Sequence, residues 1–129
     1  MSKIYKSGRK ITDAKIASNS LELTSEDLVQ LSGGFLIKAA TTGALAGITK
    51  TTKTFNSDNE TVGLEKALVI NDDDLRLKLN TTATITQDEV GSLFNIDANQ
   101  DVDAATAGTG EQLILEEIID DTVGIFSIA

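Results

Sequence analysis

Four oxygen-bearing side chains at alternating positions are the first candidates for chemistry in this sequence. They are Asp97, Asn99, Asp101 and Asp103. With this spacing an EF-hand loop begins to surround calcium with hard oxygen ligands. The sixth position of such a loop needs a sharply turning glycine and the twelfth a bidentate glutamate, but Val102 and Gly108 stand there. We therefore predict a solvated acidic loop and no metal site, with calcium binding as the alternative.

Two further acidic clusters, Asp72–Asp74 and Asp120–Asp121, could serve general acid–base catalysis if burial separated their pKa values. Both fall at predicted turns, where aspartates hydrogen-bond to their own backbone and stay hydrated. The segment Gly43–Thr51 faintly resembles a phosphate-binding loop. That loop needs a glycine directly before its lysine, and Ile48-Thr49 occupies the place. None of these segments predicts a catalytic or cofactor-binding residue.

The missing residue types narrow the possible functions further. The 129 residues include no His, Cys, Trp or Pro. Their absence excludes disulfides, thiol nucleophiles, histidine acid–base chemistry and zinc sites that use Cys or His. An enzyme that uses carboxylates alone, as glycosidases do, is the remaining catalytic alternative. No acidic cluster here has a reason to be buried, so we predict that the protein is not an enzyme and has no cofactor.

Charge is distributed unevenly along the chain, which has 11 basic and 20 acidic side chains and a formal charge of −9. Residues 1–15 hold five cations and one carboxylate, whereas the 51 residues after Lys78 hold ten carboxylates and no cation. Nucleic-acid binding requires many cations on one surface, and an acidic body opposes it. No apolar run reaches the roughly 18 residues that would span a bilayer. We predict neither a nucleic-acid nor a membrane partner.

The basic leading segment contains apolar residues between its cations. Such a pattern suits a segment that lies on another protein and becomes ordered when bound, although a solvated tail is the alternative. We predict a basic N-terminal arm over residues 1–20 and a single β domain over residues 21–129. The residues of this segment that we predict to bind the partner protein are Lys3, Ile4, Tyr5, Lys6, Arg9, Lys10 and Ile11.

Apolar residues alternate with polar ones from Leu75 to Ile85, which predicts a long, half-buried strand. The segment 111–121 has spacings that also suit a helix, but we favour a strand that forms a final hairpin with Val123–Ile128. Sixteen threonines fit a β-rich chain. Other predicted strands, separated by turn-forming residues, are Asp27–Leu31, Phe35–Ala40, Leu45–Thr49, Lys66–Asn71 and Leu93–Ile96.

One short helical turn is also predicted, because Thr86-Gln87-Asp88-Glu89 matches a capping box. Leu, Ile, Val and Phe make up 37 residues, which is enough for a packed core. The predicted fold is therefore mainly β: a small β-barrel or β-sandwich with an extended N-terminal arm and one short helical turn.

The order of these features resembles that of a known family. The relevant segments are Asp27–Leu31, Gly33–Thr41, Leu45–Ile48, Thr84–Ile96, Asp101–Asp103 and Gly110–Leu115. Together they resemble the small decoration proteins, also called cement or auxiliary capsid proteins, that coat the heads of tailed bacteriophages. In that family the early glycine-containing segment forms two strands joined by a tight turn. The resemblance covers about residues 25–50 and 84–128.

This resemblance implies a structural virion protein that binds the outer surface of an assembled capsid and stabilises it by bridging major capsid subunits. The partner would be the major capsid protein. The chain would be made in the host cytoplasm and form a homo-oligomer on the capsid lattice. The alternative is a receptor- or glycan-binding β module on the phage head or tail. Four Phe, one Tyr and no Trp supply a sugar-stacking surface poorly.

Overall fold

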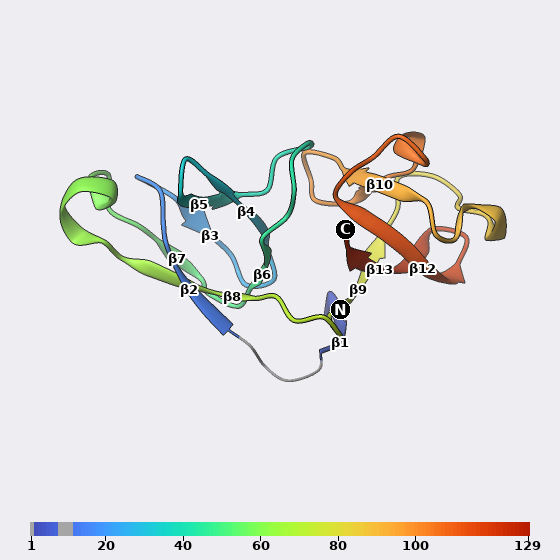
Figure 1. Ribbon diagram of the computed structural model, residues 1–129, viewed down its shortest axis with the longest axis horizontal. Helices are drawn as coiled ribbons and strands as arrows, with labels where there is room; N and C mark the ends of the chain where they lie inside the picture. Colours follow the sequence, from blue (N-terminus) through green and yellow to red (C-terminus); the bar gives the residue numbers. More distant parts are fainter. Residues whose placement is uncertain (1, 8–11) are drawn as a thin grey trace. The chain divides into compact units, whose positions relative to one another are not determined.

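The computed structural model describes residues 2–7 and 12–129, and most of its regular structure is β-strand (Figure 1). The chain forms two compact units. Unit 1 comprises Met1–Gly8, Ala40–Ala44 and Asp73–Ala129, and unit 2 comprises Arg9–Ala39 and Leu45–Asp72. Each unit has its own sheet and its own buried core.

Unit 1 contains one six-stranded sheet, in the order β1-β9-β13-β12-β10-β11. All neighbouring strands are antiparallel. Along the chain the strands are β1 (Ile4–Lys6), β9 (Arg76–Asn80), β10 (Leu93–Ile96), β11 (Val102–Asp103), β12 (Leu113–Asp120) and β13 (Val123–Ile128).

The core of unit 1 follows from alternating side chains on these strands. Phe94 and Phe126 are fully buried and meet edge to face, with ring centroids 5.7 Å apart and planes at 83°. This is a preferred geometry for aromatic pairs. Gly110 passes so close to the Phe94 backbone that a Cβ atom on it would lie 2.2 Å from the Phe94 carbonyl carbon. The lack of a side chain at Gly110 is therefore a condition for this packing.

Unit 2 contains a five-stranded antiparallel sheet, in the order β2-β8-β6-β4-β5, and a two-stranded ribbon of β3 and β7. Gly33 and Gly34, both with positive φ, form the two-residue turn between β4 and β5. The strands are β2 (Thr12–Ile16), β3 (Glu22–Leu23), β4 (Leu28–Ser32), β5 (Phe35–Lys38), β6 (Gly47–Thr49), β7 (Lys53–Thr54) and β8 (Lys66–Ile70).

The core of unit 2 contains apolar side chains from both the sheet and the ribbon. Asn59 is buried among them, in the π-helical turn η1 (Asn59–Gly63). Its amide Nδ2 donates to the carbonyls of Ala17, at 2.6 Å, and Glu65, at 3.0 Å, while its Oδ1 accepts from the Glu65 N–H. The buried amide is thus satisfied on both sides and joins the turn to the end of β2. The core residues are Ala17, Leu21, Leu23, Val29, Leu36, Phe55, Ala67 and Val69.

The mainly β class predicted from the sequence is confirmed, as are strands β4, β5, β6, β8 and β10, with small shifts at their ends. The final hairpin is confirmed as well, because β12 and β13 pair antiparallel across a turn at Asp121 and Thr122. The sheets are open and do not form a closed barrel. In each unit one isolated parallel bridge joins strands that lie apart in the sheet order. In unit 2, Ala17, which follows β2, pairs with Leu36 on β5. In unit 1, Thr81, which follows β9, pairs with Val102 on β11.

The single long strand predicted over Leu75–Ile85 is wrong in its length. The alternation of buried leucines holds through β9, but the strand ends at Asn80. The Thr81 hydroxyl donates to the Ala83 carbonyl at 2.7 Å, which turns the chain, and the register of β9 with β13 ends at the pair Asn80–Val123. Ile85 is buried after this bend rather than on the same strand.

The predicted division into an arm over residues 1–20 and one β domain over residues 21–129 also differs from the structure. Within the described part of the first 20 residues, β1 pairs with β9 in unit 1 and β2 pairs with β8 in unit 2. Ile4 lies opposite the buried Leu77, so its apolar side chain supports pairing within the chain. These residues are strands of the two units and do not form an extended arm.

The predicted helical turn is confirmed as η2 (Gln87–Glu89) with its capping box. The Glu89 carboxylate accepts from the Thr86 N–H at 2.9 Å. Two turns were not predicted, η1 and the 3-10 turn η3 (Ala104–Thr106). Among the described residues, no helix is long and apolar enough to cross a membrane.

Gln112 is a fully buried polar residue of unit 1. Its Nε2 donates to the carbonyls of Ala40, at 2.8 Å, and Gly43, at 3.0 Å, and its Oε1 accepts from the Ile96 N–H at 2.8 Å. One side chain therefore holds the segment 40–44 to the main sheet.

The substitution Gln112→Leu should lower the free energy of unfolding by about 2 kcal/mol, because it leaves the bonded backbone groups without partners. Urea unfolding would measure this loss. The matched control is Gln87→Leu, since Gln87 is exposed, and it should change stability by less than about 0.5 kcal/mol. Equal losses for the two variants would contradict a structural role for Gln112.

Glu65 has an unusual carboxylate environment in unit 2. The Asn56 N–H donates to it at 3.1 Å and the Lys53 ammonium at 3.0 Å. The Asn56 hydrogen bond, followed by that from Lys53, lowers the pKa of Glu65 below its ordinary value of 4.5. The ionised carboxylate therefore stabilises the folded state above pH 4.5, and this contribution is lost as the pH falls through the lowered pKa.

The substitution Glu65→Gln should therefore lower the melting temperature at pH 7, and the difference from the wild type should shrink at pH 3. Thermal melts at the two pH values would test this. Glu22→Gln is the control, because Glu22 is exposed on β3. A difference for Glu65→Gln that persists unchanged at pH 3 would show that the charge of Glu65 is not responsible.

Candidate functional site

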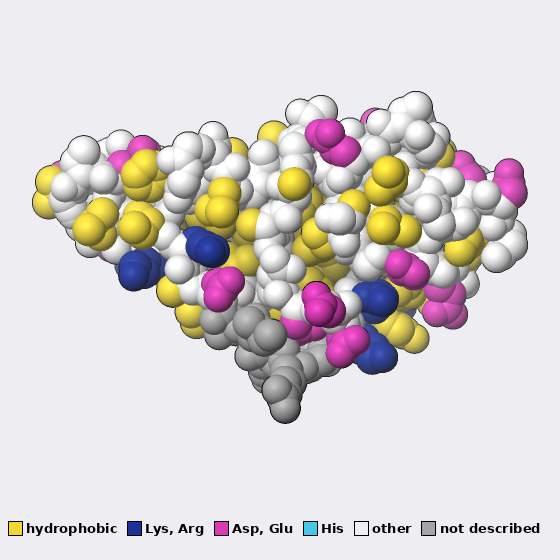
Figure 2. Space-filling view, viewed as in Figure 1, with side chains coloured by type: hydrophobic (Ala, Val, Ile, Leu, Met, Phe, Trp, Pro, Cys, Tyr) yellow, Lys and Arg dark blue, Asp and Glu magenta, His cyan; other side chains and the backbone are white. Residues whose placement is uncertain are grey.

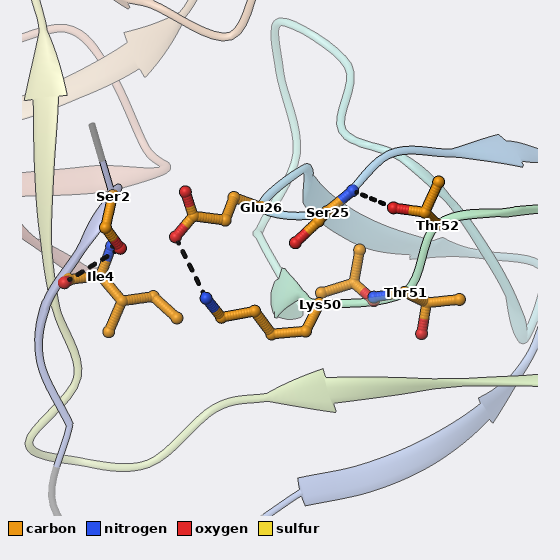
Figure 3. Close-up of polar contacts among 8 residues, drawn as sticks. Ser2, Ile4, Ser25, Glu26, Lys50, Thr51 and Thr52 are labelled. Carbon is orange, nitrogen blue, oxygen red and sulfur yellow. Dashed lines mark hydrogen bonds and ion pairs between the residues drawn. The ribbon is translucent and has the colours of Figure 1, made fainter.

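The candidate site is the edge of the unit 1 sheet where β1 pairs with β9. Ile4 lies opposite Leu77 and Lys6 opposite Arg76, with a bulge between Ile4 and Lys6. The Lys78 N–H donates to the Lys3 carbonyl at 2.7 Å, which extends the pairing by one residue. The Ser2 hydroxyl accepts from the Ile4 N–H at 3.2 Å where the strand begins (Figure 3).

This pairing gathers cations on one face of the sheet. On β9, Leu77 and Leu79 are buried, so Arg76 and Lys78 point to the opposite, outer face. Residues opposite one another in an antiparallel pair share a face, which places Lys3 beside Lys78 and Lys6 beside Arg76. Like charges in such positions destabilise a sheet. We call these four residues the cationic edge.

The cationic edge contains every basic residue of unit 1, which otherwise carries twelve Asp and Glu. The formal side-chain charge of unit 1 is therefore −8, with all its cations at one place. In the part of Figure 2 that holds β9, β12 and β13, the visible dark-blue side chains gather near β1 and β9, whereas magenta side chains are spread more widely. The edge is a local positive surface on an acidic unit.

Most of the described cations of unit 2 lie in ion pairs with carboxylates. Lys53 pairs with Glu65 at 3.0 Å and Lys38 with Asp27 at 3.3 Å. Lys50 pairs with Glu26 at 3.4 Å, next to the Ser25 N–H that donates to the Thr52 hydroxyl (Figure 3). By contrast, Lys6, Arg76 and Lys78 form no ion pair with any other described residue. Their charges are not neutralised by a paired carboxylate.

A cavity of about 200 Å³ opens beside the cationic edge. Its polar lining residues are two lysines, one asparagine, one glutamine and one aspartate. Leu79 is its one apolar lining residue. Among the polar residues, Gln100 is largely buried and has a positive φ of 64°. The polar residues of the lining are Lys3, Lys78, Asn80, Gln100 and Asp101.

Four of the seven residues predicted to bind the partner protein lie in the described part of the chain. Lys3, Ile4, Tyr5 and Lys6 lie on or beside β1, and Tyr5 is 55% exposed. The other members, Arg9, Lys10 and Ile11, lie outside the described residues. The predicted set did not include Arg76 and Lys78 of the cationic edge. Their alternation with leucines in the sequence already indicated that they lie on the polar face of a strand.

Two carboxylates of the acidic loop bond to nearby backbone N–H groups. Asp97 accepts through Oδ1 from the N–H groups of Asn99, at 2.9 Å, and Asp101, at 3.0 Å. Asp103 accepts from the Ala105 N–H at 3.1 Å at the start of η3. In the described ranges, 2–7 and 12–129, no group of three or more His, Cys, Asp or Glu could hold a metal ion. These carboxylates serve turns and caps.

The other acidic and glycine-rich segments also have local structural roles. The Asp120 carboxylate accepts from the Thr122 N–H at 2.9 Å in the final hairpin turn. The Gly43 N–H donates to the Glu111 carboxylate, and the Gly43 carbonyl accepts from Gln112. Gly43, the first residue of the segment that faintly resembles a phosphate-binding loop, is thus bonded through its backbone to two side chains of unit 1.

Comparison with known proteins identifies no family for this chain. No protein-family model matches the sequence, and no curated protein matches it. The function must therefore be argued from the residues and the geometry described above.

Addition of calcium should leave the melting temperature of the protein unchanged. The carboxylates of Asp97 and Asp103 accept from backbone N–H groups, and among the described residues no three acidic side chains gather at one point. A bound ion present at 100 times its dissociation constant would stabilise the folded state by about 2.7 kcal/mol. Thermal melts with calcium and with a chelator would detect such an effect, and a clear rise with calcium would contradict this interpretation.

Proposed function

We propose that this protein is a structural virion protein that binds the outer surface of an assembled phage capsid and stabilises it by bridging major capsid subunits. The observation that carries the proposal is the cationic edge, a positive surface on a unit of formal charge −8, in which Lys6, Arg76 and Lys78 form no ion pair with any other described residue. The resemblance of residues 25–50 and 84–128 to phage decoration proteins supplies the kind of partner.

The composition of the edge suits a protein interface. An interface core is typically built around an exposed aromatic side chain with arginine nearby. Tyr5 is the exposed aromatic of β1, and Arg76 lies across from Lys6 on β9. The Arg76 guanidinium already donates to the Leu75 carbonyl at 2.9 Å and to the Asp73 carbonyl at 3.2 Å, which holds it in place. A partly preorganised cation loses less entropy on binding.

The overall charge suits a protein present in many copies. A formal charge of −9 keeps free molecules apart through mutual repulsion. A capsid presents the same site many times, so binding as a homo-oligomer on the lattice raises the apparent affinity without any single tight contact. The proposed action is mechanical: no bond is made or broken, and no catalytic residue is assigned.

The alternative function, a receptor- or glycan-binding β module, receives less support. Sugar recognition commonly uses exposed aromatic rings. Three of the four phenylalanines, Phe55, Phe94 and Phe126, are buried, and Phe35 is only partly exposed. Tyr5 is the single aromatic residue among the exposed large apolar side chains of the described chain.

The double charge reversal Lys6→Glu with Lys78→Glu should weaken binding to empty, undecorated phage heads at least about tenfold, since it removes the net positive charge of the cationic edge, leaving two cations and two carboxylates. Co-sedimentation with heads would measure the loss. Point changes are required here because deleting residues 1–15 would remove β1 and most of β2.

The matched control is Lys15→Glu with Lys66→Glu, which makes the same change in net charge on β2 and β8 of unit 2. This control should bind heads as the wild type does, and circular dichroism should be similar for both variants. Equal weakening would show that only net charge matters. Failure of the wild-type protein to sediment with heads, or its sedimentation with host cells instead, would reject the proposed function.

A further inference from the structure

We propose that strand β2 pairs with β2 of a second copy of this chain, antiparallel and about a two-fold axis at Ala14. The contact lies in unit 2 and needs no capsid, so the inference goes beyond the proposed function. β2 is the last strand in the five-stranded sheet of unit 2, and among the described strands it pairs with β8 (Figure 1). An edge strand presents N–H and C=O groups to which another strand can add.

The backbone groups of Ala14 point to the open side of β2. The Ala17 N–H donates to the Glu65 carbonyl at 2.9 Å, which makes these two residues a hydrogen-bonded pair of the ladder with β8. Such pairs alternate along an antiparallel ladder, so Ala14 and Leu68 lie opposite one another without bonding. The Leu68 carbonyl accepts from the Thr49 hydroxyl of β6 at 2.8 Å, and so faces away from β2 as this alternation requires. Ala14 therefore presents its N–H and C=O to a strand on the other side.

β2 lacks most of the features that protect edge strands from other chains. Prolines, bulges and charged side chains are common protections. The chain has no proline, and β2 pairs residue for residue with β8 over all five of its residues. After β2, the isolated bridge of Ala17 to Leu36 closes the edge. The remaining protection is the pair of charges at Asp13 and Lys15, and these charges decide the register.

The charges of β2 are complementary when the axis lies at Ala14. Asp13 and Lys15 are two residues apart and share a face of the strand, and their side chains are 62% and 38% exposed. In this register Asp13 of each copy lies opposite Lys15 of the other. These two pairs are not hydrogen-bonded pairs of the new ladder, so their side chains approach most closely. Opposite charges in such positions stabilise a sheet.

Neighbouring registers bring like charges together. An axis at position 13 places Asp13 of one copy opposite Asp13 of the other, and an axis at position 15 does the same with Lys15. Like charges directly opposite one another are destabilising. In all three registers the outward backbone groups of the two strands can bond to each other. The side-chain charges therefore select the axis at Ala14.

The existing contacts of these residues are compatible with a second copy. Within one copy the Lys15 Nζ lies 4.0 Å from the Asp13 Oδ2, at the distance limit of an ion pair. A carboxylate accepts several hydrogen bonds and an ammonium group donates three, so each can also bond across the axis. On the other face of β2, Ala14 is exposed opposite Leu68, which is 53% exposed, so that face brings no like charges together. The four charges would form a ring of alternating sign.

Sedimentation equilibrium of the full-length protein tests this pairing. In about 0.15 M salt the Debye length is about 8 Å, which screens the long-range repulsion due to the formal charge of −9 more than it screens direct contacts. The wild type should show a monomer–dimer equilibrium as its concentration is raised. Asp13→Lys and Lys15→Asp should each raise the dimer dissociation constant at least about tenfold, because each places like charges opposite one another.

Mixing these two variants gives the sharpest result. One then carries two cations at positions 13 and 15 and the other carries two carboxylates, so opposite charges meet only in a heterodimer. The mixture should dimerise about as well as the wild type, although neither variant does so alone. Net charge cannot explain this pattern, because Asp13→Lys makes the protein less negative and Lys15→Asp makes it more negative.

The matched controls are Glu22→Lys on β3 and Lys66→Asp on β8, which make the same changes of charge at exposed positions outside β2. Each control should dimerise as the wild type does. Melting temperatures would establish that every variant is folded.

Three results would overturn the inference: a wild type that stays monomeric, single variants that dimerise as the wild type does, or a mixture that stays monomeric. The head-binding control Lys15→Glu with Lys66→Glu also changes β2, so heads are tested at concentrations where the wild type is a monomer. A monomeric wild type that binds heads would refute only the pairing. A dimer that responds to the variants as expected but ignores heads would refute only the capsid.

Discussion

The pairing of β1 with β9 is the interaction on which the candidate surface depends. It joins a short strand near the N-terminus to a strand from the middle of the chain, and so brings four cations to one face. Without this pairing, Arg76 and Lys78 would be ordinary polar residues on the outer face of a strand. With it, like charges lie opposite one another, an arrangement that folding alone does not favour. Such local conflicts are typical of functional sites.

Several polar side chains outside the cationic edge form hydrogen bonds with the backbone of their own unit. Gln112 in unit 1 and Asn59 in unit 2 are buried amides whose bonds hold a connecting segment to a sheet. Asp97, Asp103 and Asp120 accept from nearby backbone N–H groups. Groups engaged in this way stabilise turns and are not poised for proton transfer.

The two units differ in charge in a way that matters for binding. Unit 2 contains seven basic and eight acidic residues, and several of its lysines are held in ion pairs. Unit 1 is strongly acidic apart from the cationic edge. Unit 1 thus presents an acidic surface with one cationic region, and that region attracts acidic groups.

Much of the fold could be predicted from the sequence because the relevant signals are local. A period of two marks the strands, Gly33-Gly34 marks a tight turn, and Thr86 with Glu89 marks a helical cap. Each signal depends on residues a few positions apart. The tertiary structure alone decided that residues 4–6 form an edge strand and that the strand from Leu75 ends before Thr81. It also decided that Lys3 meets Lys78, because strand register and side-chain neighbours depend on long-range partners.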